Sequence, residues 1–111
     1  MYPITLSTSN ASGGAVTTVP IALDPFMSQF QATIACTVTG TANYTVQYTL
    51  DQIQADGYSP AAGNWITVTG LGTQTTSQAV ALNQPVMAIR MVQNSGAGSV
   101  SMTVLQTGAG N

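Results

Sequence analysis

Apolar and polar residues alternate along much of this sequence, and this alternation is the feature that most restricts the fold. In the stretch FQATIACTV, residues 30–38, every second side chain is apolar. The stretches YTVQYTLD, residues 44–51, and SVSMTVL, residues 99–105, repeat the pattern. A period of two residues is typical of a β-strand with one face toward an apolar core and the other toward water. We therefore expect the chain to form half-buried strands of antiparallel sheets.

Turn-forming residues divide the sequence into short strands. The segment GTAN, residues 40–43, predicts a hairpin, and the glycine-rich segment QNSGAGS, residues 93–99, predicts another. Pro20 indicates an edge strand or a bulge, because proline has no N–H for a sheet hydrogen bond. No segment shows a convincing helical period. About eight strands are expected, near residues 3–7, 15–23, 29–39, 43–51, 64–69, 75–82, 86–93 and 99–106.

This number of short strands favours an all-β fold, either an antiparallel β-sandwich or a small barrel, in a single domain that covers residues 1–111. Eight strands are the number of a jelly roll, so we expect a jelly-roll-like β-sandwich. The segment STSNASGG lacks core residues, and we expect a flexible arm over residues 7–15. The last residues, 107–111, are expected to form a flexible tail.

Charged residues make up only 4% of the chain, against about 25% in ordinary domains. Arg90 is the one basic residue, so neither nucleic acid nor an anionic membrane is an expected partner. Thr, Ser, Gln and Asn supply 42 of the 111 residues, and solubility depends on them. Such an uncharged surface suits permanent contact with other protein, because burying charge is costly. Compositional drift in a secreted or environmentally stable protein is the alternative explanation.

The sequence offers little for catalysis or metal binding, and we expect no enzyme, no cofactor and no metal site. It contains neither His to act as a base nor Lys to form a Schiff base. Cys36, the only thiol, lies on the apolar face of its strand, so a buried structural role is expected. Calcium ligation by Asp51, Asp56 and loop carbonyls is conceivable, but these residues follow no recognised loop motif.

Four residues are candidates for contact with a neighbouring subunit: Asp51, Tyr58, Trp65 and Arg90. Arg90 lies on a strand whose two faces are both rather apolar, so this strand is expected to be central or covered by a partner. Arg90 is expected either to pair with an Asp such as Asp51, within the chain or between subunits, or to expose its tip above a buried stem. Trp65 is out of phase with Ile66, which predicts a place on the outer face. Tyr58 and Trp65 either contact a partner or pack the long loop.

Three motifs occur together in the later part of the chain. VQYTLD, residues 46–51, precedes a long loop that ends at Trp65. PVMAIR, residues 85–90, is followed by a glycine-rich turn and by SVSMTVLQ, residues 99–106. In this combination the sequence from Tyr44 onward resembles small virion proteins of tailed bacteriophages. The resemblance implies an all-β capsid decoration or cement protein, a type that often forms trimers on the outer shell and clamps neighbouring major capsid subunits.

The leading hypothesis is therefore a non-enzymatic virion protein on the capsid exterior. It would bind the major capsid protein and stabilise contacts between capsid subunits as a homo-oligomer, with a trimer favoured. The composition agrees, because without His nothing titrates near pH 6–7 and few ion pairs are present for salt to screen. The alternatives are a tail, neck or head-fibre component, and a carbohydrate-binding β-sandwich module that uses Asp56, Tyr58 and Trp65.

Overall fold

The computed structural model describes residues 3–9, 14–23, 28–51 and 63–109. These residues form strands, turns and loops but no helix, and hence no helix long and apolar enough to cross a membrane. The strands of the described chain are β1 (Ile4–Ser9), β2 (Val16–Thr17), β3 (Ile21–Ala22), β4 (Ser28–Thr39), β5 (Asn43–Thr49), β6 (Ile66–Thr67), β7 (Gln78–Leu82), β8 (Ala88–Ser95) and β9 (Ser99–Ala109).

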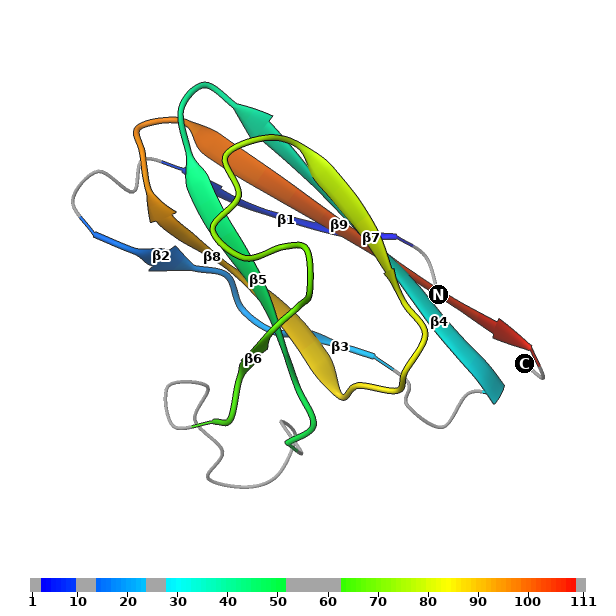
Figure 1. The fold of residues 1–111 in the computed structure, drawn as a ribbon. Helices are drawn as coiled ribbons and strands as arrows, with labels where there is room; N and C mark the ends of the chain where they lie inside the picture. The colour runs from blue at the N-terminus through cyan, green and yellow to red at the C-terminus, as the bar shows by residue number, and fades with distance from the viewer. Residues whose placement is uncertain (1–2, 10–13, 24–27, 52–62, 110–111) are drawn as a thin grey trace.

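The strands form two antiparallel sheets that pack face to face (Figure 1). The first sheet has the order β1-β9-β4-β7. The second has the order β2-β8-β5-β6, and β3 pairs with β8 on the same side as β2. The all-β sandwich expected from the alternation is therefore confirmed, and β8, which carries Arg90, is a central strand as predicted.

The strand order is that of a jelly roll. Strands β2 and β3 lie one after the other along β8, separated by a short break that contains Pro20, and act as one interrupted edge strand. With β2 and β3 counted as one strand, the strands pair from the two ends of the chain inward. β1 pairs with β9, β2 and β3 pair with β8, β4 pairs with β7, and β5 pairs with β6. Successive pairs alternate between the two sheets, which is the arrangement of the double-sheet jelly roll.

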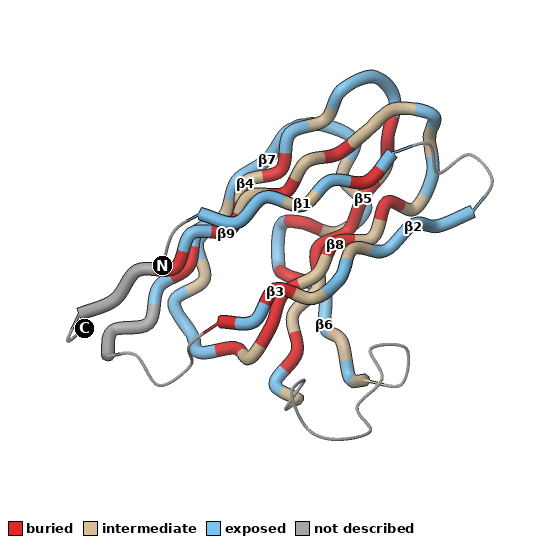
Figure 2. The backbone as a smooth tube through the Cα atoms, turned by 180° about the vertical axis from the view of Figure 1, so that it is seen from behind, coloured by how far each residue is buried: buried red, intermediate tan, exposed pale blue. Residues whose placement is uncertain are grey.

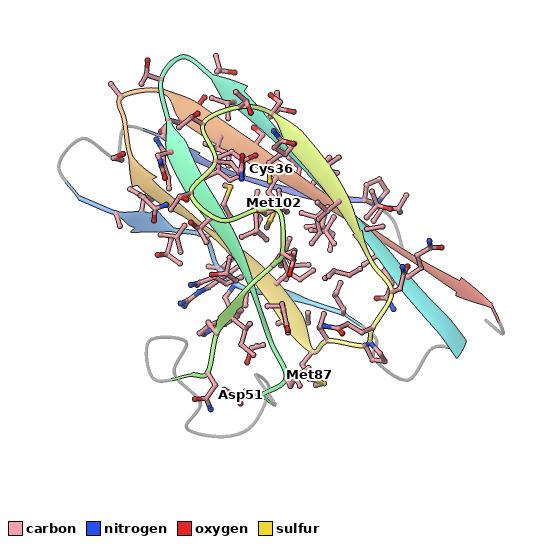
Figure 3. All side chains as sticks on the ribbon, viewed as in Figure 1. Cys36, Asp51, Met87 and Met102 are labelled. Atoms are coloured by element: carbon pink, nitrogen blue, oxygen red, sulfur yellow. The ribbon has the colours of Figure 1, made fainter. Side chains whose placement is uncertain are left out.

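The core consists of the inward positions of both sheets, as the alternation of buried and exposed residues along the strands in Figure 2 shows. In the first sheet Cys36 lies opposite Met102, and Figure 3 places the two side chains together between the sheets. In the second sheet Val46 lies opposite Met91. All four side chains are at most 2% exposed. Apolar burial of this kind is the main favourable contribution to folding.

Parts of the arm and of the tail expected from the sequence belong to strands. Residues 7–9, expected to begin a flexible arm, belong to β1, and Thr8 is only 5% exposed. A polar side chain can occupy this position because its hydroxyl donates to Gln93 Oε1 at 2.8 Å. Of the tail expected over residues 107–111, residues 107–109 belong to β9, which pairs with β4, and residues 110–111 lie outside the described residues. Within the arm, residues 10–13 lie outside the described residues.

The segment TGLGT, residues 69–73, carries a core residue that the strand pattern did not reveal. Leu71 is fully buried, and its carbonyl accepts a hydrogen bond from Val46 N at 2.9 Å. Gln74 and Tyr44 exchange two further backbone hydrogen bonds. The connection between β6 and β7 therefore extends the edge of β5 and closes the core at one side, in place of a longer β6.

Candidate functional site

Arg90 and Trp65 form the clearest charged feature of the described surface. The guanidinium carbon of Arg90 lies 4.2 Å from the centre of the Trp65 ring, within the range of a cation–π contact worth about 1 kcal/mol. Arg90 Nε also donates to Gln47 Oε1 at 2.9 Å. Gln47 and Arg90 are directly opposite each other on the neighbouring strands β5 and β8. Ile89 and Met91, on either side of Arg90, face the core. The side chains of Arg90, Gln47 and Trp65 therefore lie on the outer face of the second sheet.

The predicted outer position of Trp65 is confirmed by this contact. Thr67, two residues later, pairs with Gln47, so the Trp65–Thr67 side of β6 continues the face that carries Arg90. The Trp65 side chain is half-buried. Tyr58, the other aromatic contact candidate, lies outside the described residues, as does Asp56.

Asp51 holds together the two ends of the segment between β5 and β6. Its Oδ2 accepts from Asn64 N at 2.7 Å, its Oδ1 accepts from Asn64 Nδ2 at 3.5 Å, and its own N–H donates to Thr49 Oγ1 at 3.0 Å. Asp51 and Arg90, which are both described by the structure, therefore do not form the pair that was one of the expectations. The register explains the difference, because it places Gln47 opposite Arg90 and leaves Asp51 beyond the last paired residue of β5 (Figure 3).

A polar cluster continues the same outer face toward the other end of β5. Asn94 Nδ2 donates to Asn43 Oδ1 at 2.9 Å and to Thr45 Oγ1 at 3.0 Å, and Thr45 Oγ1 also accepts from Thr73 N at 2.9 Å. The sequence analysis did not predict this cluster. A sign of it is present in the sequence, because Asn43, Thr45 and Gln47 are polar residues at alternate positions on the same face of one strand. The amides and hydroxyls bind one another, which orders the face without any charge.

Cys36 and Tyr44 are buried together in the core and are chemically inert near neutral pH. Burial raises the pKa of the Cys36 thiol to about 12, although a hydrogen bond with Tyr44 opposes the shift. Burial, together with the neighbouring Cys36, raises the pKa of Tyr44 to about 12. Tyr44 Oη donates to the carbonyl of Thr76 at 2.8 Å. A thiol that keeps its proton is a poor nucleophile, so the structural role expected for Cys36 agrees with its surroundings.

The outer face of the first sheet is covered mainly by small uncharged side chains, with Leu105 exposed among them beside Thr33. Thr5 Oγ1 lies 2.9 Å from Thr103 Oγ1, and Ser7 Oγ lies 2.9 Å from Ser101 Oγ. The outward positions of β4 and β7 continue these rows. We call this surface the hydroxyl face; it comprises Thr5, Ser7, Thr33, Ala35, Thr37, Ala79, Ser101 and Thr103.

A shallow depression of about 360 Å³ lies over β4 and the start of β7. Its lining is formed by Ala35, Cys36, Thr37, Ser77, Gln78 and Ala79. This lining offers hydroxyl and amide hydrogen bonds, and its one titratable group is the buried thiol of Cys36. Across the described residues, no three His, Cys, Asp or Glu side chains come together as metal ligands.

No family model matches this sequence, and no curated protein matches it either. The function must therefore be argued from the fold and from its two outer faces.

Proposed function

We propose that this protein is a non-enzymatic structural component of a bacteriophage virion. In this proposal it is a decoration protein that binds the outer shell and stabilises contacts between major capsid subunits. The tail, neck or head-fibre role is the other virion location to be distinguished. A jelly roll is compatible with this assignment, since viral capsid and lectin domains both use the fold, but a fold alone does not specify a function.

The observation that carries the proposal is the uncharged hydroxyl face of the first sheet. Asp51 and Arg90 are the only charged residues in the described chain, and neither lies on this sheet. An interface that buries small hydroxyl and methyl groups avoids the large desolvation cost of buried charge. Charged residues are also depleted at the centres of protein interfaces in general. A face of this kind therefore suits long-lived contact with a shell.

Repetition would supply the strength that one such face lacks. A shell presents many equivalent sites, and an oligomer of this chain, with a trimer favoured, would bind several at once. Linked binding of this kind raises the overall affinity by about 10²–10⁴ without any new contact. The same uncharged surface would keep the contact nearly independent of salt, because few exposed ion pairs are present for salt to screen.

Binding of the purified protein to virus particles that lack it tests the proposal. We expect saturation at hundreds of copies distributed over the shell, together with a higher temperature of particle disruption. Ala35→Arg should weaken binding at least ten-fold, because it adds a charge to the hydroxyl face. Thr67→Arg adds the same charge to the outer face of the second sheet and should have little effect.

The distribution of bound copies distinguishes the virion roles. A few copies confined to a tail or neck would replace decoration by the second role. Failure of the wild-type protein to bind any particle would overturn both.

A carbohydrate-binding module is the second candidate, and one observation favours it. Trp65 lies on an outer face beside Gln47 and Arg90, which supplies an aromatic surface together with hydrogen-bonding groups. A glycan array would detect this function. Binding of a defined glycan that is lost in Trp65→Ala, in a protein that ignores virus particles, would favour the module over the virion role.

A further inference from the structure

The edges of the two sheets differ in how well they are protected. An unprotected edge strand presents free N–H and C=O groups to which another strand can pair. In the second sheet, β6 is two residues long and the opposite edge is divided into β2 and β3, two residues each, around Pro20. Short edge strands and proline are common means of preventing such pairing. In the first sheet, the edge strand β1 is neither short nor interrupted by proline.

Strand β1 is the longest edge strand of the described chain. Its six residues, ITLSTS, include no charge and no proline, whereas the opposite edge strand β7 has five residues. Figure 2 shows β1 largely exposed along the margin of the first sheet. Ile4 is 37% exposed although it lies on the apolar side of the strand. The edge therefore offers both free backbone groups and uncovered apolar surface.

The side chains of β1 make the strand complementary to itself. Thr5 and Ser7 point outward, where each already pairs with a hydroxyl of β9. Leu6 points toward the core side and is half-buried. An antiparallel pair of identical strands has a two-fold axis perpendicular to the sheet, so outward side chains meet outward side chains and core-side residues meet core-side residues. No charge is present on either strand to oppose the contact.

We infer that β1 pairs antiparallel with β1 of a second copy of this chain. Leu6 faces Leu6 of the second copy at the two-fold axis, and Thr5 faces Ser7 of the second copy on either side of it. This register brings the two half-buried Leu6 side chains together and covers Ile4 with Thr8 of the second copy. It joins two four-stranded sheets into one continuous sheet and doubles the hydroxyl face. The inference does not depend on the virion role, because it concerns only the edge of the sheet, but its two-fold pairing makes a dimer in place of the trimer favoured above.

Sedimentation equilibrium of an edge variant tests the pairing. Wild-type protein should approach twice the 11.3 kDa mass of the chain. Thr5→Glu/Ser7→Glu places like charges directly opposite each other across the two-fold, and it should weaken association at least ten-fold. Thr33→Glu/Thr37→Glu adds the same two charges to the same face on the interior strand β4 and should remain dimeric. Circular dichroism melting verifies that both variants fold.

Two results of this experiment would overturn the inference. One is a wild-type protein that stays monomeric up to about 1 mM, an affinity too weak to be specific. The other is an oligomer that both glutamate pairs weaken equally, or that neither pair affects.

Disulfide trapping tests the register independently. Residues directly opposite each other have Cβ atoms about 4.5–5.5 Å apart, whereas diagonal neighbours are about 7–8 Å apart. A mixture of Thr5→Cys and Ser7→Cys proteins should therefore form a mixed disulfide under mild oxidation. Either variant alone should form much less, and the buried Cys36 should not take part. Absence of the mixed product, or a stronger Ser7→Cys homodimer, would contradict this pairing.

Discussion

Gln93 is the polar side chain at which both sheets and one hairpin meet. It is fully buried, and its Oε1 accepts the hydroxyl of Thr8 from the first sheet at 2.8 Å. Its Nε2 donates to the carbonyls of Gly96 and Gly98 in the β8–β9 turn, at 3.2 and 3.1 Å. A buried amide is tolerated only when its donors and acceptors are paired. Thr8 therefore fixes β1 against the second sheet through one hydrogen bond.

Thr8→Val should be costly although it conserves the shape of the side chain. It removes the donor to a buried oxygen, and leaving such a group unsatisfied costs about 1–3 kcal/mol. Thr5→Val is the matched control, because it breaks an exposed hydroxyl pair on the same strand and should cost about 0.5 kcal/mol or less. Urea unfolding of both variants measures the difference. Equal losses would show that burial of the Thr8–Gln93 bond contributes nothing.

Residue partners of this kind were the least predictable part of the molecule. The composition pattern placed Thr8 in an arm because a polar residue gives no local sign that its partner lies on a distant strand. One of the two expectations for Arg90 was a pair with an Asp such as Asp51, but the register of β5 against β8 brought Gln47 opposite it instead. Register depends on the whole sheet and is therefore absent from any local pattern. The outer position of Trp65 was predictable, since alternation alone determines it.

The two tight turns of the sandwich pack backbone against backbone, which explains their glycines at the scale of elements. Gly98 N donates to the carbonyl of Thr41 at 2.7 Å, so the β8–β9 turn is bonded to the β4–β5 turn. A Cβ at Gly98 would overlap the carbonyl of Thr39 and approach Thr41 N to 2.7 Å. Because these obstacles are backbone atoms, neither turn can move aside without disturbing its strands.

Gly98→Ala should therefore destabilise the protein by about 3 kcal/mol, the upper end of the usual penalty for overpacking. Gly72→Ala is a suitable control: the nearest atom to its Cβ is Thr67 Cγ2 at 3.1 Å, on an exposed side chain that can shift. The control should lose under about 1 kcal/mol. Thermal melting with both variants compares the two turns. Similar melting temperatures would mean that the turns separate easily.

Strands were predictable to the extent that they alternate. The strongly patterned segments gave β4, β5 and β9 with small errors at their ends, because one buried face imposes a period of two, and the less regular segment 86–93 gave β8. The segment 64–69 shortened to the two residues of β6, since the following chain turns inward to bury Leu71. A single buried leucine in a glycine-rich connection has no periodicity to reveal it. The jelly-roll strand order agreed with an expectation based on strand number.

The whole molecule is stabilised with very little charge. Only Asp51 and Arg90 are charged in the described chain. Asp51 binds Asn64, and the contacts of Arg90 include Gln47 and Trp65. Because charged residues make up only 4% of the sequence and it contains no His, the stability should respond weakly to salt and to pH near neutrality. The exception lies in the core, where Cys36 and Tyr44 both keep their protons to higher pH than in an unfolded chain.

This difference predicts an alkaline limit to stability. Below about pH 8 both groups are almost fully protonated whether the chain is folded or unfolded, so their contribution to stability is fully present. As pH rises past the ordinary values of 9.0 for the thiol and 10.0 for the phenol, the unfolded chain releases protons that the folded chain retains until about pH 12. The free energy of unfolding must then fall, by up to about 1.4 kcal/mol per pH unit for each proton.

Urea unfolding between pH 6 and pH 11 measures the effect. The free energy of unfolding should be flat to about pH 8 and decline above pH 9, with the decline steepening above pH 10 as the phenol joins the thiol. Cys36→Ala lowers the overall stability, but its alkaline decline should begin about one pH unit later because only the phenol remains. Tyr44→Phe should keep the onset near pH 9 and lose the second, steeper part. An identical pH profile in all three proteins would show that the shared burial of Cys36 and Tyr44 does not limit stability.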